Sequence, residues 1–85
     1  MASKFNLFSL YAEQPIVTLE PPGGNVQYLG FAELGTKTLD DAKFSILRIT
    51  EDEDTGMTLY QWANGRRDYD LPFSGYADYE YLFLT

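Results

Sequence analysis

The apolar residues of this chain fall into short alternating runs joined by short connections rich in turn-forming residues. An apolar period of two is typical of β-strands. Connections this short do not carry the crossovers that parallel strands need, so neighbouring strands are expected to be antiparallel. The sequence therefore predicts an all-β fold, a small antiparallel meander or open barrel of five to six short strands with an N-terminal arm. The expected strands include residues 16–20, 26–34, 43–50, 57–62 and 76–85.

The strongest break in the chain is the segment 21–25, which reads Pro-Pro-Gly-Gly-Asn. Its prolines lack a backbone donor, and its glycines accept positive φ angles. Two interpretations are open: a hinge between an N-terminal arm, residues 1–20, and a single β domain, residues 26–85, or an ordinary surface loop. Within the arm, residues 4–11 are apolar on both faces of a strand, which suits a sandwiched strand or an arm that lies on a neighbour. A helix is the alternative there, although its polar residues are poor helix formers.

Three local signals lie inside the predicted β domain. Gly30 interrupts an apolar strand, which indicates either a bulge or a close approach of the backbone to another segment. Residues 39–42 are expected to form a single helical turn with Thr38 as its N-cap. The dipeptide Asn64-Gly65 favours a type I′ turn.

The last run, residues 76–85, alternates like a terminal strand after an irregular stretch. Because side chains alternate between the two faces of a strand, Ala77, Tyr79, Tyr81 and Phe83 are expected on the inward face. Tyr79 and Tyr81 suit the core and an interface equally well.

The chain is 85 residues long and contains neither cysteine nor histidine. A chain of this length buries only about 60–65% of its unfolded surface, and no disulfide can staple it. Oligomerisation or docking on another protein is therefore the expected further source of stability. The lack of histidine removes the commonest general base and the commonest metal ligand.

The formal net charge of the chain is −7. A chain this acidic does not bind nucleic acid through a patch that neutralises phosphates, so no nucleic-acid partner is expected. No apolar run approaches the roughly 20 residues that span a bilayer. The N-terminus also lacks the apolar core of a signal peptide. We therefore expect no membrane association and synthesis in a cytoplasm.

Acidic side chains are the most visible candidates for chemistry. Residues 51–54 read Glu-Asp-Glu-Asp and precede Gly56, but no later glutamate completes a calcium loop. A solvated hairpin tip, kept away from other strand edges by its charge, is the better interpretation. A carboxylate pair such as Asp68 and Asp70 would need a pocket that raises one pKa, and a β domain this small has little room for one. We expect no enzymatic activity, no catalytic or metal-binding residue and no cofactor.

Aromatic residues are the better candidates for function, because tyrosine and phenylalanine are enriched where proteins contact one another. Tyr76 is the strongest candidate, since it precedes the last strand and falls on its polar face. The interface residues predicted from the sequence are Phe5, Phe8, Tyr11, Tyr60, Tyr69, Phe73 and Tyr76.

A series of short motifs runs through residues 28–81. In this order and spacing they resemble the pattern of a group of short bacteriophage proteins, which are virion-associated or uncharacterised. Phe44 stands where that pattern has tryptophan, and Ser74 and Tyr76 stand where it has aspartate and arginine. The motifs are Tyr28-Leu29-Gly30, Ala32, Gly35-Thr36, Ala42, the strand 44–50 ending in Arg-Ile-Thr, Trp62-Ala63-Asn64-Gly65, Tyr69-Asp70, Phe73-Ser74, Tyr76 and Tyr79-Glu80-Tyr81.

The resemblance implies a bacteriophage virion structural protein, a small component present in many copies that docks on capsid or tail proteins. A decoration or cement role, an adaptor role and a fibre-base role all fit. The partners would be other virion proteins, the chain would be a homo-oligomer or lattice-bound, and it would reach the virion after synthesis in the host cytoplasm.

Two other functions are open at this level. The first is an acidic phage-encoded inhibitor that mimics DNA and blocks a host nucleic-acid-binding enzyme, because spaced carboxylates can imitate a phosphate backbone. The second is a glycan- or receptor-binding module. That module would need an exposed Trp62, whereas Trp62 is expected in the core.

Overall fold

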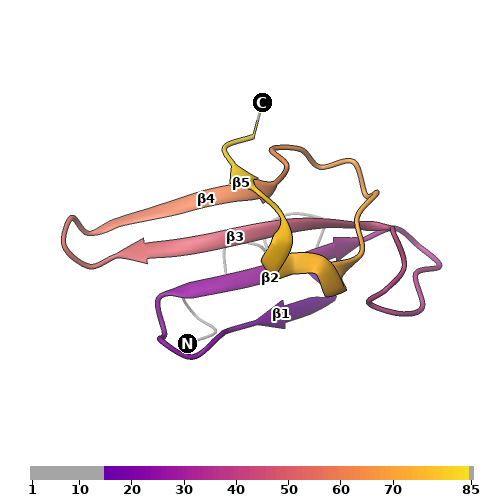
Figure 1. The fold of residues 1–85 in the computed structure, drawn as a ribbon, viewed down its shortest axis with the longest axis horizontal. Helices are drawn as coiled ribbons and strands as arrows, with labels where there is room; N and C mark the ends of the chain where they lie inside the picture. Colours follow the sequence, from indigo (N-terminus) through magenta and orange to yellow (C-terminus); the bar gives the residue numbers. More distant parts are fainter. Residues whose placement is uncertain (1–14, 85) are drawn as a thin grey trace.

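The protein is described here by a computed structural model that covers residues 15–84, which form one antiparallel sheet and a short 3₁₀ helix (Figure 1). The five strands lie in chain order, so each strand pairs with its neighbour in sequence. The predicted all-β antiparallel meander is confirmed, as an open sheet with β1 and β5 at its two edges. The elements are β1 Val17–Leu19, β2 Val26–Ala32, β3 Phe44–Asp52, β4 Met57–Ala63, η2 Phe73–Asp78 and β5 Tyr81–Leu82.

Strand β1 is part of the sheet and pairs with β2, with Val17 opposite Gly30. Residues 21–25 therefore connect two paired strands of the sheet. The rest of the predicted arm, residues 1–14, lies outside the described residues. The predicted interface residues Phe5, Phe8 and Tyr11 lie there too.

The longest strand, β3, occupies the centre of the sheet. It pairs with β2 from Val26↔Thr50 to Ala32↔Phe44, and on its other side it pairs with β4. The β3–β4 hairpin projects along the long axis of the molecule (Figure 1). Its turn, residues 53–56, carries the acidic tip that the sequence predicted.

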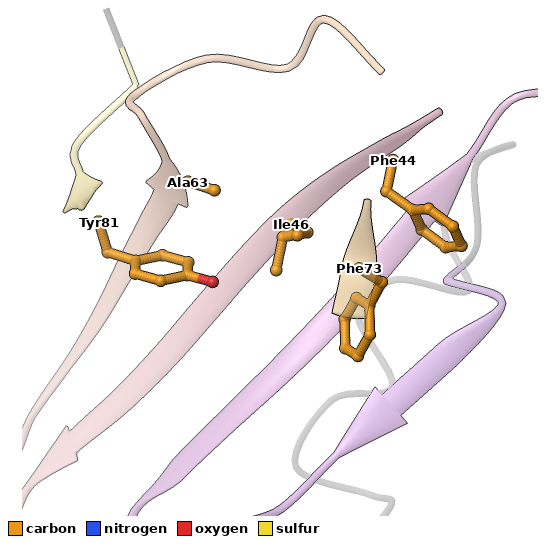
Figure 2. Close-up of a cluster of buried hydrophobic side chains, with 5 residues drawn as sticks. All are labelled: Phe44, Ile46, Ala63, Phe73 and Tyr81. Atoms are coloured by element: carbon orange, nitrogen blue, oxygen red, sulfur yellow. The ribbon is translucent and has the colours of Figure 1, made fainter. Parts of the chain in front are cut away.

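Both faces of the sheet carry an apolar cluster, because β3 alternates with large apolar side chains on each side. On one face, Phe44 and Ile46 pack with Ala63, Phe73 and Tyr81 (Figure 2). On the opposite face, Leu29, Phe31, Leu47 and Ile49 form a second buried cluster, with Trp62 and Tyr69 packed against it. Ser45, on that second face, is also buried, and its hydroxyl accepts a hydrogen bond from the N–H of Tyr69 at 3.2 Å.

Gly30 lies at the point where three segments meet on the face of the first cluster. A Cβ atom at this position would lie 2.6 Å from Cγ1 of Val17, 2.8 Å from Cδ1 of Phe73 and 3.1 Å from Cδ2 of Phe44. The β2–β3 register runs without interruption through Gly30. Of the two expectations, the structure therefore has the close approach and not the bulge.

The predicted terminal strand over residues 76–85 is wrong. Residues Phe73–Asp78 form the 3₁₀ helix η2, and the strand β5 comprises only Tyr81–Leu82. The reason lies in contacts that local alternation does not reveal: the Tyr79 hydroxyl donates to the Pro72 carbonyl at 2.7 Å, which folds this segment back on itself. Tyr81 is buried as expected, whereas Phe83 and Ala77 are exposed.

Two turns show how side chains decide local structure. The Asn64-Gly65 pair has φ angles of 57° and 71°, as the predicted type I′ turn requires. The expected helical turn over 39–42 is instead a non-helical turn. The Asp41 carboxylate accepts the N–H groups of Lys37 and Thr38 and the Thr38 hydroxyl, and these hydrogen bonds, that from Lys37 first, lower the pKa of Asp41.

Candidate functional site

The structure places the predicted interface residues in different environments. Tyr60 lies on β4 and is exposed, and Tyr69 is half-buried against the second cluster. Phe73 is 3% exposed and belongs to the core, so it is no part of an accessible surface in the described protein. These residues therefore do not gather into one patch, and Tyr60 is the member that reaches solvent most fully.

Tyr76, the strongest candidate from the sequence, packs inward. Its ring centroid lies 4.8 Å from that of Tyr28 and 5.8 Å from that of Phe73, and its carbonyl accepts the Tyr81 hydroxyl at 2.8 Å. The expectation that Tyr76 faces outward assumed a strand, in which it would share the polar face. The 3₁₀ helix η2 turns its side chain toward the sheet instead.

Exposed apolar side chains lie along β4, at Met57 and Tyr60, and at the C-terminal end of the described chain, in residues 82–84. Residues 57–61 of β4 form an open strand edge, because β5 pairs only with Trp62 and Ala63 and no other strand within residues 15–84 lies beside it. We call residues 57–61 the β4 edge. The exposed apolar residues of β4 and of the C-terminal segment are 40–57% exposed and comprise Met57, Tyr60, Leu82, Phe83 and Leu84.

Sequence reasoning found Tyr60 in this group and missed the others. Phe83 was expected to face inward because the predicted last strand, residues 76–85, is longer than β5, Tyr81–Leu82. A usable signal was present, since Leu82, Phe83 and Leu84 are consecutive and a strand cannot turn three successive side chains to one face. At least one of them must point away from the core wherever the strand ends.

The acidic hairpin tip next to the β4 edge shows no sign of a metal site. The Asp52 carboxylate accepts the N–H of Asp54 at 3.0 Å, and Gly56 has a φ of 76° that closes the turn. Hollows of about 240 and 370 Å³ lie against residues 51–59. Within the described part of the chain, no three acidic side chains converge as metal ligands would.

The carboxylates that suggested acid–base chemistry are held by an arginine. Arg66 contacts Asp68 at 3.0 Å and Asp70 at 2.6 Å, and all three side chains are largely exposed. The hydrogen bond that Arg66 donates to Asp70, and after it the one that it donates to Asp68, raises the pKa of Arg66. Both carboxylates are thereby held in ion pairs with one cation at the surface of the domain.

A cation and an aromatic ring meet beneath η2. The Arg48 guanidinium lies 4.8 Å from the Tyr81 ring centroid, and its Nη2 donates to Gln61 Oε1 at 2.9 Å. Burial raises the pKa of the Tyr81 hydroxyl well above its ordinary value. Burial is also the main cause that raises the pKa of the Tyr79 hydroxyl. This arrangement stabilises the packing of β5 on β3 and offers no reactive group.

The raised pKa of Tyr81 predicts alkaline sensitivity. Its folded-state pKa lies above the value of about 10 for an unfolded tyrosine, so the stabilisation is complete below pH 10 and is lost as the pH rises past it. Urea unfolding at pH 8 and pH 11 should show a lower free energy of unfolding at pH 11. Tyr81→Phe should flatten this decline, at the cost of about 1 kcal/mol at pH 8 for the lost hydrogen bond to Tyr76. An equally steep decline in Tyr81→Phe would contradict the assignment to this hydroxyl.

Comparison with known proteins gave no match, because no family model, no curated protein and no solved structure shows significant similarity to this chain. In the described residues, no helix is long and apolar enough to cross a membrane.

Proposed function

We propose that this chain is a small, non-enzymatic structural protein of a bacteriophage virion, present in many copies, which docks on capsid or tail proteins through its β4 edge. The observation that carries the docking role is the open, uncharged strand edge at residues 57–61, where Met57 and Tyr60 are exposed beside unpaired strand backbone. Strand edges recruit further strands through backbone hydrogen bonds, and aromatic and methionine side chains are enriched at interfaces.

The virion assignment is supported by the motif pattern over residues 28–81, and the fold gives several motif positions a physical reason. Gly30 is needed where Val17 and Phe73 approach β2. The Asn64-Gly65 pair supplies the two positive φ angles that end β4. These motif positions have structural roles, so the resemblance is a resemblance in fold. A shared fold is consistent with a protein that acts by binding other proteins through its surface.

The two rival functions have less support from the described residues. A DNA mimic needs a row of free carboxylates, yet Asp68 and Asp70 are engaged by Arg66. A glycan-binding module needs an open aromatic platform, yet Trp62 is half-buried and lies 4.7 Å beneath the Arg67 guanidinium. Docking through the β4 edge, in contrast, needs only side chains that are exposed, such as Met57 and Tyr60.

Mass spectrometry of purified phage particles tests this proposal. The protein should copurify with intact particles in a fixed ratio to the major capsid protein, because a structural component is present in stoichiometric amounts. A protein that is abundant in infected cells and missing from the particles would rule out the virion role.

Substitutions at the β4 edge should weaken incorporation into particles. The double variant Tyr60→Ala/Phe83→Ala removes one exposed side chain of the β4 edge and one that follows β5, and truncation of an interface hot spot lowers affinity about tenfold or more. Ile16→Ala is the matched control, because Ile16 is also exposed but lies beside β1 at the opposite edge of the sheet. Circular dichroism should show that both variants fold. Equal incorporation of the edge variant and the control would contradict docking at the β4 edge.

A further inference from the structure

We infer that residues 4–11 fold back across the sheet and cover the second cluster, on the face opposite η2. That cluster comprises Leu29, Phe31, Leu47 and Ile49. The domain would then have three layers, with η2 on one face of the sheet and the N-terminal segment on the other. This inference goes beyond the proposed docking role and does not depend on it.

The register of the strands fixes which side chains share the face of the second cluster. Leu29 pairs with Leu47, and Leu47 pairs with Trp62, so these three side chains project from the same side of the sheet. The helix η2 packs on the other side, where it contributes Phe73 to the first cluster. Within residues 15–84, no helix or strand is therefore layered on the second cluster.

The second cluster is nevertheless closed to solvent, since its four side chains are at most 2% exposed. The described apolar side chains that pack against it are Trp62 on β4 and Tyr69 in the connection that follows β4. Leu29, on β2, is 1% exposed although its partner on β1, Thr18, is itself exposed. A side chain stands roughly perpendicular to its sheet, so neighbours within the sheet shield its sides and leave its end open. The burial of Leu29 therefore indicates a further layer on this face.

The segment before β1 has the composition and the length to form this layer. Residues 5–12 carry no charge, and Lys4 and Glu13 flank them. At about 3.3 Å per residue, residues 1–14 extend to about 46 Å, whereas the four spacings of a five-stranded sheet add up to about 19 Å. The segment can therefore cross the whole face. Its five large apolar side chains are Phe5, Leu7, Phe8, Leu10 and Tyr11.

The chain also enters the sheet beside the second cluster, which favours its own N-terminus over a second copy. The N–H of Ile16 donates to the carbonyl of Gly30 at 2.9 Å, and Gly30 lies between Leu29 and Phe31 on β2. The segment is therefore tethered next to the side chains that it would cover. A short tether gives a roughly millimolar effective concentration, which a second copy at micromolar concentration does not reach.

Paramagnetic broadening of methyl signals in the full-length protein tests this inference. The sequence contains no cysteine, so Ser9→Cys provides a single site for a nitroxide label within residues 4–11. The nitroxide should abolish the methyl signals of Leu29 and Leu47 and leave the signal of Ile46 much stronger. Ile46 is the appropriate reference because it follows the same strand but faces the first cluster, and broadening falls steeply with distance.

Ala77→Cys is the matched control. Ala77 is exposed on η2, so a nitroxide at this position should give the reverse pattern and broaden Ile46 more than Leu47. Contacts between copies are detected in a mixture of isotope-labelled protein without nitroxide and nitroxide-labelled Ser9→Cys without isotope. That mixture should show no broadening, because the covering segment belongs to the same chain.

Every other outcome overturns the inference. If the label in Ser9→Cys broadens Ile46 as strongly as Leu47, or broadens neither, residues 4–11 do not lie on this face. Broadening of Leu47 in the mixture would assign the cover to a second copy. Circular dichroism checks that the labelled variants fold, and Asn6→Cys serves as a second labelling position if Ser9→Cys does not fold. The virion role is tested separately, because copurification with particles does not depend on any of these results.

Discussion

Replacing Phe44 with alanine is expected to lower the free energy of unfolding by about 3–5 kcal/mol, the usual cost of emptying a buried phenylalanine site. Phe44 is 0% exposed and begins the central strand. Its ring lies 5.8 Å from that of Phe73, and its backbone exchanges two hydrogen bonds with Leu71. The truncation therefore weakens the contact between the sheet and η2 as well as the strand itself.

This loss is large compared with the whole stability of the domain. At 0.05–0.15 kcal/mol per residue, 85 residues give a total of about 4–13 kcal/mol. Phe44→Ala should therefore be largely unfolded at 37 °C when the parent sits at the lower end of that range, and should show a clearly reduced urea midpoint otherwise. Chemical denaturation followed by the fluorescence of Trp62 measures the effect.

Phe83→Ala is the matched control for Phe44→Ala. It makes the same chemical change at a side chain that is 57% exposed, so it should alter the free energy of unfolding by less than about 0.5 kcal/mol. If the two variants lost equal stability, the assignment of Phe44 to the core and of Phe83 to the surface would be wrong. The control is also informative for function, because Phe83 belongs to the surface proposed to dock.

The parts of the fold that sequence reasoning predicted are those that local pattern determines. Alternation in residues 43–50 identified the central strand, and the Asn64-Gly65 pair identified the turn after β4 from residue type alone. Gly30 was recognised as a position of either close approach or bulge, and only the positions of Val17 and Phe73 in space decide between them. The alternation of apolar residues indicates which side chains face the core, whereas the arrangement of the strands in space determines which residues they contact.

The C-terminal region shows why other parts of the fold could not be predicted from the sequence. Residues 76–85 alternate as a strand would, yet β5 comprises only Tyr81–Leu82. The deciding contacts are the burial of Phe73 against β2 and β3 and the hydrogen bond from Tyr79 to Pro72, which join segments by tertiary packing. The open edge of β4 was missed for the same reason. Because the last strand is shorter than expected, residues 57–61 of β4 have no partner strand on one side within the described residues, and Phe83 is exposed.

Substituting Gly30 with valine is expected to destabilise the protein by about 3 kcal/mol, at the upper end of what overpacking costs. Even the Cβ atom would lie 2.6 Å from Val17 and 2.8 Å from Phe73, closer than unstrained side chains approach. Gly30 is not among the residues with positive φ, so the effect comes from volume and not from backbone conformation. Valine's preference for strands is worth at most about 1 kcal/mol and cannot offset a clash with two separate elements.

A double-mutant cycle distinguishes this explanation from a general sensitivity of β2. Gly30→Ala alone should cost about 1–3 kcal/mol, and combining it with Val17→Ala removes the shorter of the two contacts. The paired variant should therefore lose less free energy of unfolding than the sum of the two single variants, with a coupling of about 1 kcal/mol. Strict additivity would mean that the Cβ atom does not meet Val17. Since Val17 lies opposite Gly30 in the β1–β2 pairing, additivity would also argue that β1 is not packed as the sheet requires.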